Sequence, residues 1–407
     1  MGAPIDLASA RATFEASTDF TVGLEEEFAL LDPATLDLVP RFEELRDAAA
    51  QEDPTLHAQI TGELISSELE IVSGRGEDVH DAIARQRDLR RRFFVLAQSR
   101  GIALGATGTH PWADYREQRN IDTEHYRRVV DGLGYVARRN NTFSLHVHVG
   151  VQGADRAVRT ADRLRPVLPV LLAYSANSPF VDGRDAGLHS ARTQTFTRMF
   201  PRCGVPDAYG SWAAYEEYID LLVRTRSVVE YTQIWWSVRP HFSYGTVEVR
   251  ICDAQSSAAE SEALASLIVA CVAQAARDVE EGVPFEDPAP RFIEENIWRA
   301  VRHGMDGNLL DLDAGIEIPA AAALETLAAW TAPVRAELGI EAPRIGEGPN
   351  GAQRQMSARA AGADLRDVYA CTVRETAETY GMAPRTSSSV AIGSQGDPIA
   401  CGRRIDE

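Results

Sequence analysis

Several short segments of this chain alternate apolar residues with histidine or glutamate. In the segment 144–150, His146 and His148 share one face of an extended strand and three aliphatic residues share the other, because side chains on a strand alternate between its faces. A single histidine is more often structural than a ligand, but two on one strand face, in a chain with nine histidines, favour metal binding. We therefore expect this strand to rest on a core and to present two imidazoles to a ligand.

Glutamates follow the same alternation near the N-terminus. Glu25 and Glu27 would project from one face of a strand, where their charges repel unless solvent or a cation screens them. For such a pair taken alone, the alternative to a cation site is a strand face exposed to solvent. Glu26 falls on the opposite face with Leu24 and Phe28, so we expect it to reach solvent or to pair with an arginine rather than to join a site.

A second group of glutamates lies in the strand region 56–72. Glu68 and Glu70 share a face, whereas Glu63 is an odd number of residues from Glu70 and would face away from it in a straight strand. If Glu63 and Glu70 serve one site, a bulge or a break near Ser66 and Ser67 must separate them. The residues alone leave open whether Glu63 and Glu68 belong to the site.

Arginines accompany the glutamates. Glu248 and Arg250 share a strand face, either as a structural ion pair or, in a metal and phosphate site, as a metal ligand beside a phosphate clamp. Each of the other candidate arginines, taken alone, is better explained as a surface residue. Four are expected in loops around the sheet, where they could bind carboxylates or phosphates: Arg192, Arg198, Arg202 and Arg239.

Together these segments predict one antiparallel sheet whose polar faces form a metal and phosphate site. Two histidines with several glutamates suit Mn²⁺ or Zn²⁺, and one histidine with many carboxylates suits Mg²⁺ or Mn²⁺. The sequence has no Gly-x-x-x-x-Gly-Lys-Ser/Thr loop and no full dinucleotide-binding turn. A nucleotide bound here would have its phosphates held by metals and arginines.

Interleaved strands and helices in the first part of the chain, followed by helices, predict an α+β fold. We expect strands over 20–31, 56–72, 102–106, 140–151, 232–237 and 245–252, with 239–242 connecting the last two. Helices are expected over 41–51, 77–101, 124–139, 155–175 with a bend at Pro166 and Pro169, 211–225, 257–281, 290–302, 320–338 and 360–381. The segment 177–210 predicts a long functional loop. We divide the chain into a lead-in over 1–19, one domain over 20–383 and a disordered tail over 384–407.

The composition indicates an ordinary globular protein. The chain has 407 residues, of which 44% are hydrophobic, and a net charge of −19, which argues against nucleic acid or an anionic membrane as a partner. Five widely spaced cysteines predict free thiols in a reducing compartment. Because we find neither a secretory leader nor an apolar run of membrane-spanning length, we expect a cytoplasmic protein.

The ordered motifs resemble the glutamate–cysteine ligase type 2 family, also called carboxylate–amine ligases, of the glutamine synthetase-like superfamily. The resemblance covers about residues 20 to 381 and rests on the motifs at 21–27, 63–74, 105–111, 144–151, 192–206 and 247–250. It implies one catalytic domain over 20–383, built on a curved antiparallel sheet whose concave face binds ATP and divalent metals.

The resemblance also assigns roles to single residues. The implied metal ligands are Glu25, Glu27, Glu63, Glu70, His146 and Glu248. The nucleotide phosphates would meet His148, Arg239 and Arg250, and the substrate would meet Arg192 and Arg198. Catalysis is assigned to Glu27 and Arg250.

The implied reaction joins a carboxylate to an amine with hydrolysis of ATP. The carboxylate attacks the γ-phosphate to give an acyl phosphate and ADP, and the amine then displaces phosphate, with Mg²⁺ or Mn²⁺ neutralising charge. The default substrates are L-glutamate and L-cysteine, giving γ-glutamylcysteine. The alternatives are a ligase for another carboxylate and amine, a related metal-dependent phosphotransferase, and a non-catalytic metal or nucleotide binder. Relatives also suggest a homodimer.

Overall fold

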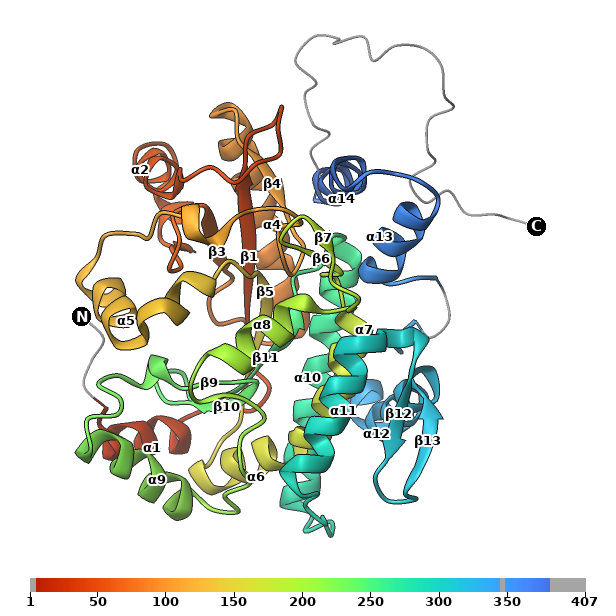
Figure 1. Cartoon of the computed structure of the whole chain (residues 1–407). Coiled ribbons are helices and arrows are strands. Elements are labelled where there is room, and N and C mark those ends of the chain that lie inside the picture. The colour runs from red at the N-terminus through yellow and green to blue at the C-terminus, as the bar shows by residue number, and fades with distance from the viewer. Residues whose placement is uncertain (1–4, 345–347, 381–407) are drawn as a thin grey trace.

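A seven-stranded sheet lies at the centre of the molecule (Figure 1). The computed structural model describes residues 5–344 and 348–380, so the predicted tail lies outside the described residues. The strand order is β10-β11-β5-β1-β3-β2, with β4 paired to the end of β1, and every pair is antiparallel. The strands are β1 (Val22–Leu31), β2 (Ile60–Thr61), β3 (Glu68–Val72), β4 (Ala103–Gly105), β5 (Ser144–Gly150), β10 (Val238–His241) and β11 (Thr246–Asp253). The predicted α+β class with an antiparallel sheet is confirmed.

The register of the central strands brings the polar residues of separate segments side by side. Glu25 of β1 lies opposite His146 of β5, and Glu27 lies opposite Glu70 of β3. His148 likewise lies opposite Glu248 of β11. Directly opposite residues in an antiparallel pair share a face, with Cβ atoms about 5 Å apart, so one sheet face carries these charged groups together.

The other face of the sheet rests on the main hydrophobic core. Leu24, Val147 and Val249 are fully buried there. The helices α6 (Ala154–Leu164), α7 (Leu168–Ser175) and α10 (Ala258–Glu280) pack on this side. The helix α4 (Val79–Ser99) covers the far half of the sheet, where Phe93 meets Phe28 in an edge-to-face contact. The aliphatic residues of the alternating segments therefore face this core, and the polar residues between them face the opposite side of the sheet.

Most predicted helices form close to their expected bounds. The bend expected at Pro166 and Pro169 is a 3₁₀ turn at Arg165–Val167 between α6 and α7. The last predicted helix, over 360–381, begins later, at Leu365, after Gly362 with its φ of +102°, and the helix before it, over residues 351–360, was not predicted. The further helices are α2 (Phe42–Glu52), α3 (Pro54–His57), α5 (Glu124–Leu133), α9 (Trp212–Arg224), α11 (Pro290–His303), α12 (Ala320–Leu338), α13 (Gly351–Ala360) and α14 (Leu365–Thr379).

Two of the predicted connecting segments were wrong, and the expected lead-in contains a helix. The segment 177–210 is not a loop throughout, because it contains helix α8 (Ala191–Met199), which Ser190 caps by accepting from the backbone of Thr193. Residues 239–242 are not a connection, since β10 pairs with β11 as an edge strand, where a proline is tolerated. The expected lead-in contains helix α1 (Leu7–Glu15), held by the buried Phe14.

Small paired strands complete the described structure. The predicted strand over 232–237 is reduced to two residues, in β9. The pairs are β6 (Phe180–Val181) with β7 (Arg184–Asp185), β8 (Cys203–Gly204) with β9 (Trp235–Trp236), and β12 (Asn308–Asp311) with β13 (Ile316–Pro319). Single 3₁₀ turns occur at Tyr115–Glu117, Gly134–Arg139, Tyr231–Gln233 and Gly304–Asp306.

One described helix, α10, is long and apolar enough to cross a membrane by length and composition. Of its most apolar window, 72% is buried inside the protein, and the helix lies against the sheet in Figure 1. Burial of this kind is typical of a core helix, which passes the same test.

Candidate active site

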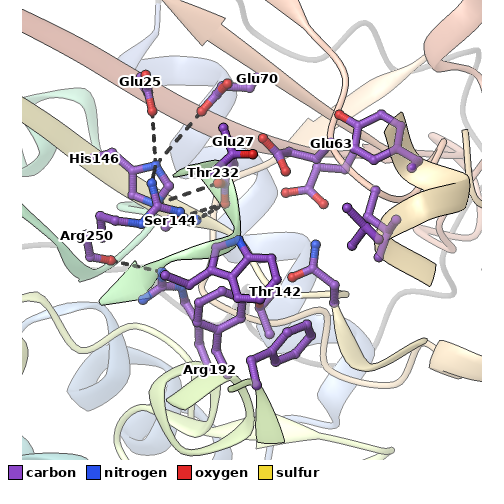
Figure 2. Close-up of a pocket in the computed structure, with 18 of the residues that line it drawn as sticks. Glu25, Glu27, Glu63, Glu70, Thr142, Ser144, His146, Arg192, Thr232 and Arg250 are labelled. Atoms are coloured by element: carbon purple, nitrogen blue, oxygen red, sulfur yellow. Dashed lines mark hydrogen bonds and ion pairs between the residues drawn. The ribbon is translucent and has the colours of Figure 1, made fainter. Parts of the chain in front are cut away.

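The polar face of the sheet borders a cavity of about 240 Å³. Five glutamates line it, together with arginines, a strand histidine and several aromatic side chains (Figure 2). Its acidic residues come from β1, β3 and the segment between β2 and β3: Glu25, Glu27, Glu63, Glu68 and Glu70. Segments far apart in the sequence therefore converge on one hollow.

His146 is the centre of the first group of charges, as Figure 2 shows. Its Nδ1 lies 3.2 Å from Glu25 Oε2 and 4.0 Å from Glu70 Oε1, and its Nε2 lies 3.8 Å from Glu27 Oε1. Ser144 joins the group, because its hydroxyl is 2.7 Å from both Glu27 Oε2 and His146 Nε2. Ser144 was not predicted as a site residue, although its even spacing from His146 places it on the same face.

His148 forms a second group deeper in the sheet. Its Nε2 lies 3.1 Å from Glu25 Oε1 and 3.7 Å from Glu248 Oε1, and its Nδ1 lies 3.0 Å from Thr246 Oγ1. Burial alone would lower the pKa of His148, but the charges of Glu25 and Glu248 raise it above its usual value. Burial would likewise raise the pKa of Glu25, yet His148 and His146 bring it well below its usual value.

The third group contains carboxylates only. Glu63 lies with Glu27 and Glu70 at the cavity. The break required between Glu63 and Glu70 is present, since β2 ends at Thr61 and β3 begins at Glu68. Burial and the charges of Glu27 and Glu25 raise the pKa of Glu63 to about 8. Burial and the charges of its three neighbouring carboxylates also raise the pKa of Glu70 well above its usual value.

Glu68 lines the same cavity from the start of β3. It is 1% exposed, and its Oε2 has no hydrogen-bond partner among the described residues. Burial and the neighbouring charges of Glu27 and Glu63 raise the pKa of Glu68 well above its usual value. It therefore borders the site without belonging to any of the three groups described above.

These groups have the geometry of cation sites. Within each, one possible ligand atom per residue lies within 4.8 Å of the other two. The raised pKa values of Glu63 and Glu70 mean that like charges repel here, and a cation would relieve this repulsion. Oxygen-rich donors with few imidazoles fit hard divalent cations. The sets are Glu25–His148–Glu248, Glu25–Glu70–His146 and Glu27–Glu63–Glu70.

Two arginines flank the carboxylate of Glu248, which is fully buried. Arg239 Nε donates to Glu248 Oε2 at 2.6 Å, and Arg250 Nη1 donates to Glu248 Oε1. Burial would lower the pKa of Arg250, but Glu248 raises it above its usual value. Both arginines line the cavity, and Arg239 reaches it from strand β10 rather than from a loop.

The two predicted substrate arginines have different positions. Arg192 lines the cavity from α8, not from a loop, and its guanidinium donates to the backbone carbonyls of Ile251 and Arg250 at 2.9 and 3.1 Å. Arg198 lies on the same helix, but its Nη2 pairs with Glu294 at 2.5 Å and half of its side chain is exposed. The structure does not bring Arg198 to the cavity. Arg202, also expected in a loop, donates to the carbonyl of Gln233 instead.

Other cavity residues carried no recognisable signal in the sequence. They come mostly from α5, α8 and the segment before β10, and single aromatic or polar residues at such positions are indistinguishable from packing residues. They include His125, Tyr126, Asn140, Thr142, Phe196, Phe200, Thr232 and Trp235.

Glu26 has the role expected for it on the reverse side of β1. Arg90 of α4 donates to both of its carboxylate oxygens, and Gln86 donates to Oε2 at 2.9 Å. Arg90 is 2% exposed. The middle residue of the three consecutive glutamates is thus a buried ion pair, while its neighbours face the cavity.

Comparison with known proteins places this arrangement in a family. A family model described as glutamate-cysteine ligase family 2 matches residues 21–369. A protein of Solibacter usitatus with the provisional name glutamate–cysteine ligase 2 is 37% identical, over 89% of this chain and 94% of its own length. A protein of Rubrobacter xylanophilus, provisionally named glutamate–cysteine ligase 2-2, is 40% identical over 83% of this chain and 86% of its own length.

Solved structures share the fold at low sequence identity. The glutamate–cysteine ligase of Francisella tularensis, in complex with AMP, has a TM-score of 0.64 at 13% identity, covering 89% of this chain and 90% of that one. A bifunctional glutathione synthetase from Pasteurella multocida has a TM-score of 0.61 at 13% identity, covering 92% of this chain and 54% of that one. The chain therefore belongs to glutamate-cysteine ligase family 2, and it is an ATP-dependent ligase that forms a carbon–nitrogen bond.

Proposed function

We propose that this ligase activates a carboxylate as an acyl phosphate and transfers the acyl group to an amine, with L-glutamate and L-cysteine as the default pair. The observation that carries the proposal is the convergence of carboxylates from β1 and β3 with Arg250 of β11 at one cavity, with the buried Glu248 grouped beside Glu25. The provisional names of the relatives support L-glutamate and L-cysteine, and the AMP bound to the Francisella ligase supports an adenine nucleotide. The net charge of −19 fits a cytoplasmic enzyme that acts on small molecules.

The residues of the three candidate cation sets would hold Mg²⁺ or Mn²⁺. They are the six predicted ligands together with His148: Glu25, Glu27, Glu63, Glu70, His146, Glu248 and His148. Bound there, such cations would screen the negative charge of the triphosphate. His148, predicted to meet phosphate, does not line the cavity and lies in a set with Glu25 and Glu248, which favours a ligand role instead.

The arginines supply the fixed positive charge. Arg250 faces the cavity with Nε free of hydrogen bonds to the described residues, so it can donate to a phosphoryl oxygen while Nη1 stays on Glu248. Arg192 has a similarly unpaired Nε and could bind a substrate carboxylate. Arg239 holds Glu248 in place from the other side. Charge stabilisation by such preorganised donors dominates phosphoryl transfer.

A screen of carboxylates and amines tests the proposal. The full-length protein is incubated with ATP, Mg²⁺ or Mn²⁺, L-glutamate and a panel of amines including L-cysteine, and products are identified by mass. We expect ADP release to require both the carboxylate and the amine. ADP release with accumulation of a stable phosphorylated product, and no need for an amine, would contradict the proposal and favour a phosphotransferase.

Glu27→Gln is the matching variant. It keeps the size of the side chain and can still accept a hydrogen bond from Ser144, but it removes one charge from the third cation set. We expect turnover to fall at least about 100-fold, with the circular dichroism spectrum unchanged. The exposed Glu341→Gln is the control, and undiminished turnover in Glu27→Gln would refute the site.

A further inference from the structure

Amide formation requires a general base for the amine, and the residues described so far do not supply one. An amino-acid amine is largely protonated near pH 7, and its nitrogen cannot attack until a proton leaves. In the proposed site, the glutamates of the three cation sets, His146 and His148 would be committed to cations, and arginine does not act as a base at this pH. A base for the amine must therefore come from another part of the cavity.

His125 occupies such a place. It lies in the first turn of α5 and lines the cavity together with Tyr126 and Val129. Two contacts hold this helix start: Thr123 caps it by accepting from the backbone of Tyr126, and Tyr126 donates its hydroxyl to the carbonyl of Gly62. The position of His125 relative to the segment 62–67, which carries Glu63, is thereby fixed.

A buried carboxylate orients the imidazole of His125. Glu230 Oε1 lies 2.8 Å from His125 Nδ1, and the Glu230 side chain is 3% exposed, whereas that of His125 is 33% exposed. Both carboxylate oxygens of Glu230 are buried without a hydrogen bond to the described residues, and a buried carboxylate needs a donor. Nδ1 of His125 is within donor distance, so we place the proton of a neutral His125 there. The lone pair is then on Nε2. A base held by a third group in this way has the arrangement used to activate nucleophiles.

We propose that His125, oriented by Glu230, is the general base that deprotonates the amine substrate; this rests on the proposed function. One proton passes from the ammonium to His125 Nε2, which frees the nitrogen lone pair. That pair forms the C–N bond to the acyl carbon while the C–O bond to phosphate breaks, and the phosphate leaves with the bonding electrons. The second proton of the nitrogen goes to the departing phosphate, and His125 returns its own to solvent.

The competing base is Glu68, the cavity carboxyl outside the three cation sets. A second competing explanation is that the His125–Glu230 pair has only a structural role and holds α5 in place beside the cavity. These alternatives predict different behaviour with an amine that needs no base. Hydroxylamine is such an amine, since it is largely unprotonated at neutral pH.

The experiment compares L-cysteine with hydroxylamine as the acceptor, with L-glutamate, ATP and Mg²⁺. The variant His125→Asn places an amide N–H where Nδ1 stood, so the contact with Glu230 is kept and the base is lost. We expect its kcat with L-cysteine to fall about 100-fold, with kcat for hydroxamate formation and the KM for L-glutamate within about twofold of wild type. Glu230→Gln keeps the contact without its charge, and we expect a smaller loss with the same dependence on the acceptor.

Each result is decisive. Equal losses of kcat with both acceptors would mean that the pair has only a structural role. Undiminished activity with L-cysteine would also overturn the proposal. A defect rescued by hydroxylamine in Glu68→Gln but not in His125→Asn would assign the base to Glu68. If His125→Asn does not fold, the acceptor dependence of Glu230→Gln decides. A wild-type protein that forms neither product would overturn the proposed function itself, and with it this inference.

Discussion

Binding of a divalent cation to this protein should release protons. The free site holds more carboxyls than it can keep ionised, because they are buried together. Ligation requires the ionised form, so a proton retained on Glu63 or Glu70 must leave when Mn²⁺ binds between them. The perturbation is therefore the addition of Mn²⁺ to the full-length, metal-free protein at pH 7.

The size of the release follows from the site. With a pKa of about 8, Glu63 is roughly nine-tenths protonated at pH 7. The pKa of Glu70 is also raised well above its usual value, and the neighbouring carboxyls titrate as a group. We expect about one to two protons per protein at pH 7. Fewer should be released as the pH approaches 9, where these carboxyls are already ionised.

Isothermal titration calorimetry measures the release directly. The binding heat is compared in buffers of different ionisation enthalpy, such as PIPES and Tris, and its slope gives the number of protons. Glu63→Gln should lower this number by about one, whereas the exposed Glu341→Gln should leave it unchanged. Identical heats in both buffers would mean that the carboxyls are ionised before the metal arrives, and the electrostatic account of the site would be wrong.

Three further predictions concern stability. Arg90→Met leaves the buried Glu26 charge without its main partner, and should lower the free energy of unfolding in urea by about 3–5 kcal/mol. Burial lowers the pKa of His110 to about 4, below the unfolded value near 6.5, so stability should fall as the pH falls between these values, by about 3 kcal/mol in total. This loss should be absent in His110→Gln when urea midpoints are compared across pH. Gly351→Ala would place a Cβ 2.0 Å from Asn177 Oδ1, and should lower the thermal midpoint because α13 must move; an unchanged midpoint would contradict this packing.

The sequence was sufficient to predict the sheet and its acidic face because both depend on a period of two. Glu25, Glu27, His146 and Glu248 each lie in a strand whose opposite face is mostly apolar, and such an alternation is typical of a half-buried strand. The register then follows from burial of the aliphatic face. The family resemblance added the roles of ligand and phosphate clamp, which alternation by itself left open against a solvated face or an ion pair.

What the sequence could not predict depends on contacts between distant segments. Arg192 and Arg198 are six residues apart and were equivalent candidates, yet α8 directs one to the cavity and the other to Glu294. The helix itself was missed because Gly, Pro and Arg around it dominate the composition of 177–210. His125 gave no signal either, since its partner Glu230 is more than a hundred residues away.

The three consecutive glutamates of β1 explain how an acidic site can coexist with a stable strand. A shift of β1 by one residue would turn Glu25 and Glu27 into the core and leave only Glu26 facing the cavity. Arg90 and Gln86 provide hydrogen-bond donors for only one buried carboxylate on that side of β1. In the shifted strand two glutamates would point there, and the second carboxylate would be buried without a partner. An unpaired buried charge costs several kcal/mol. The reverse-side ion pair therefore helps to determine which glutamates face the cavity, although it lies on the other side of the sheet.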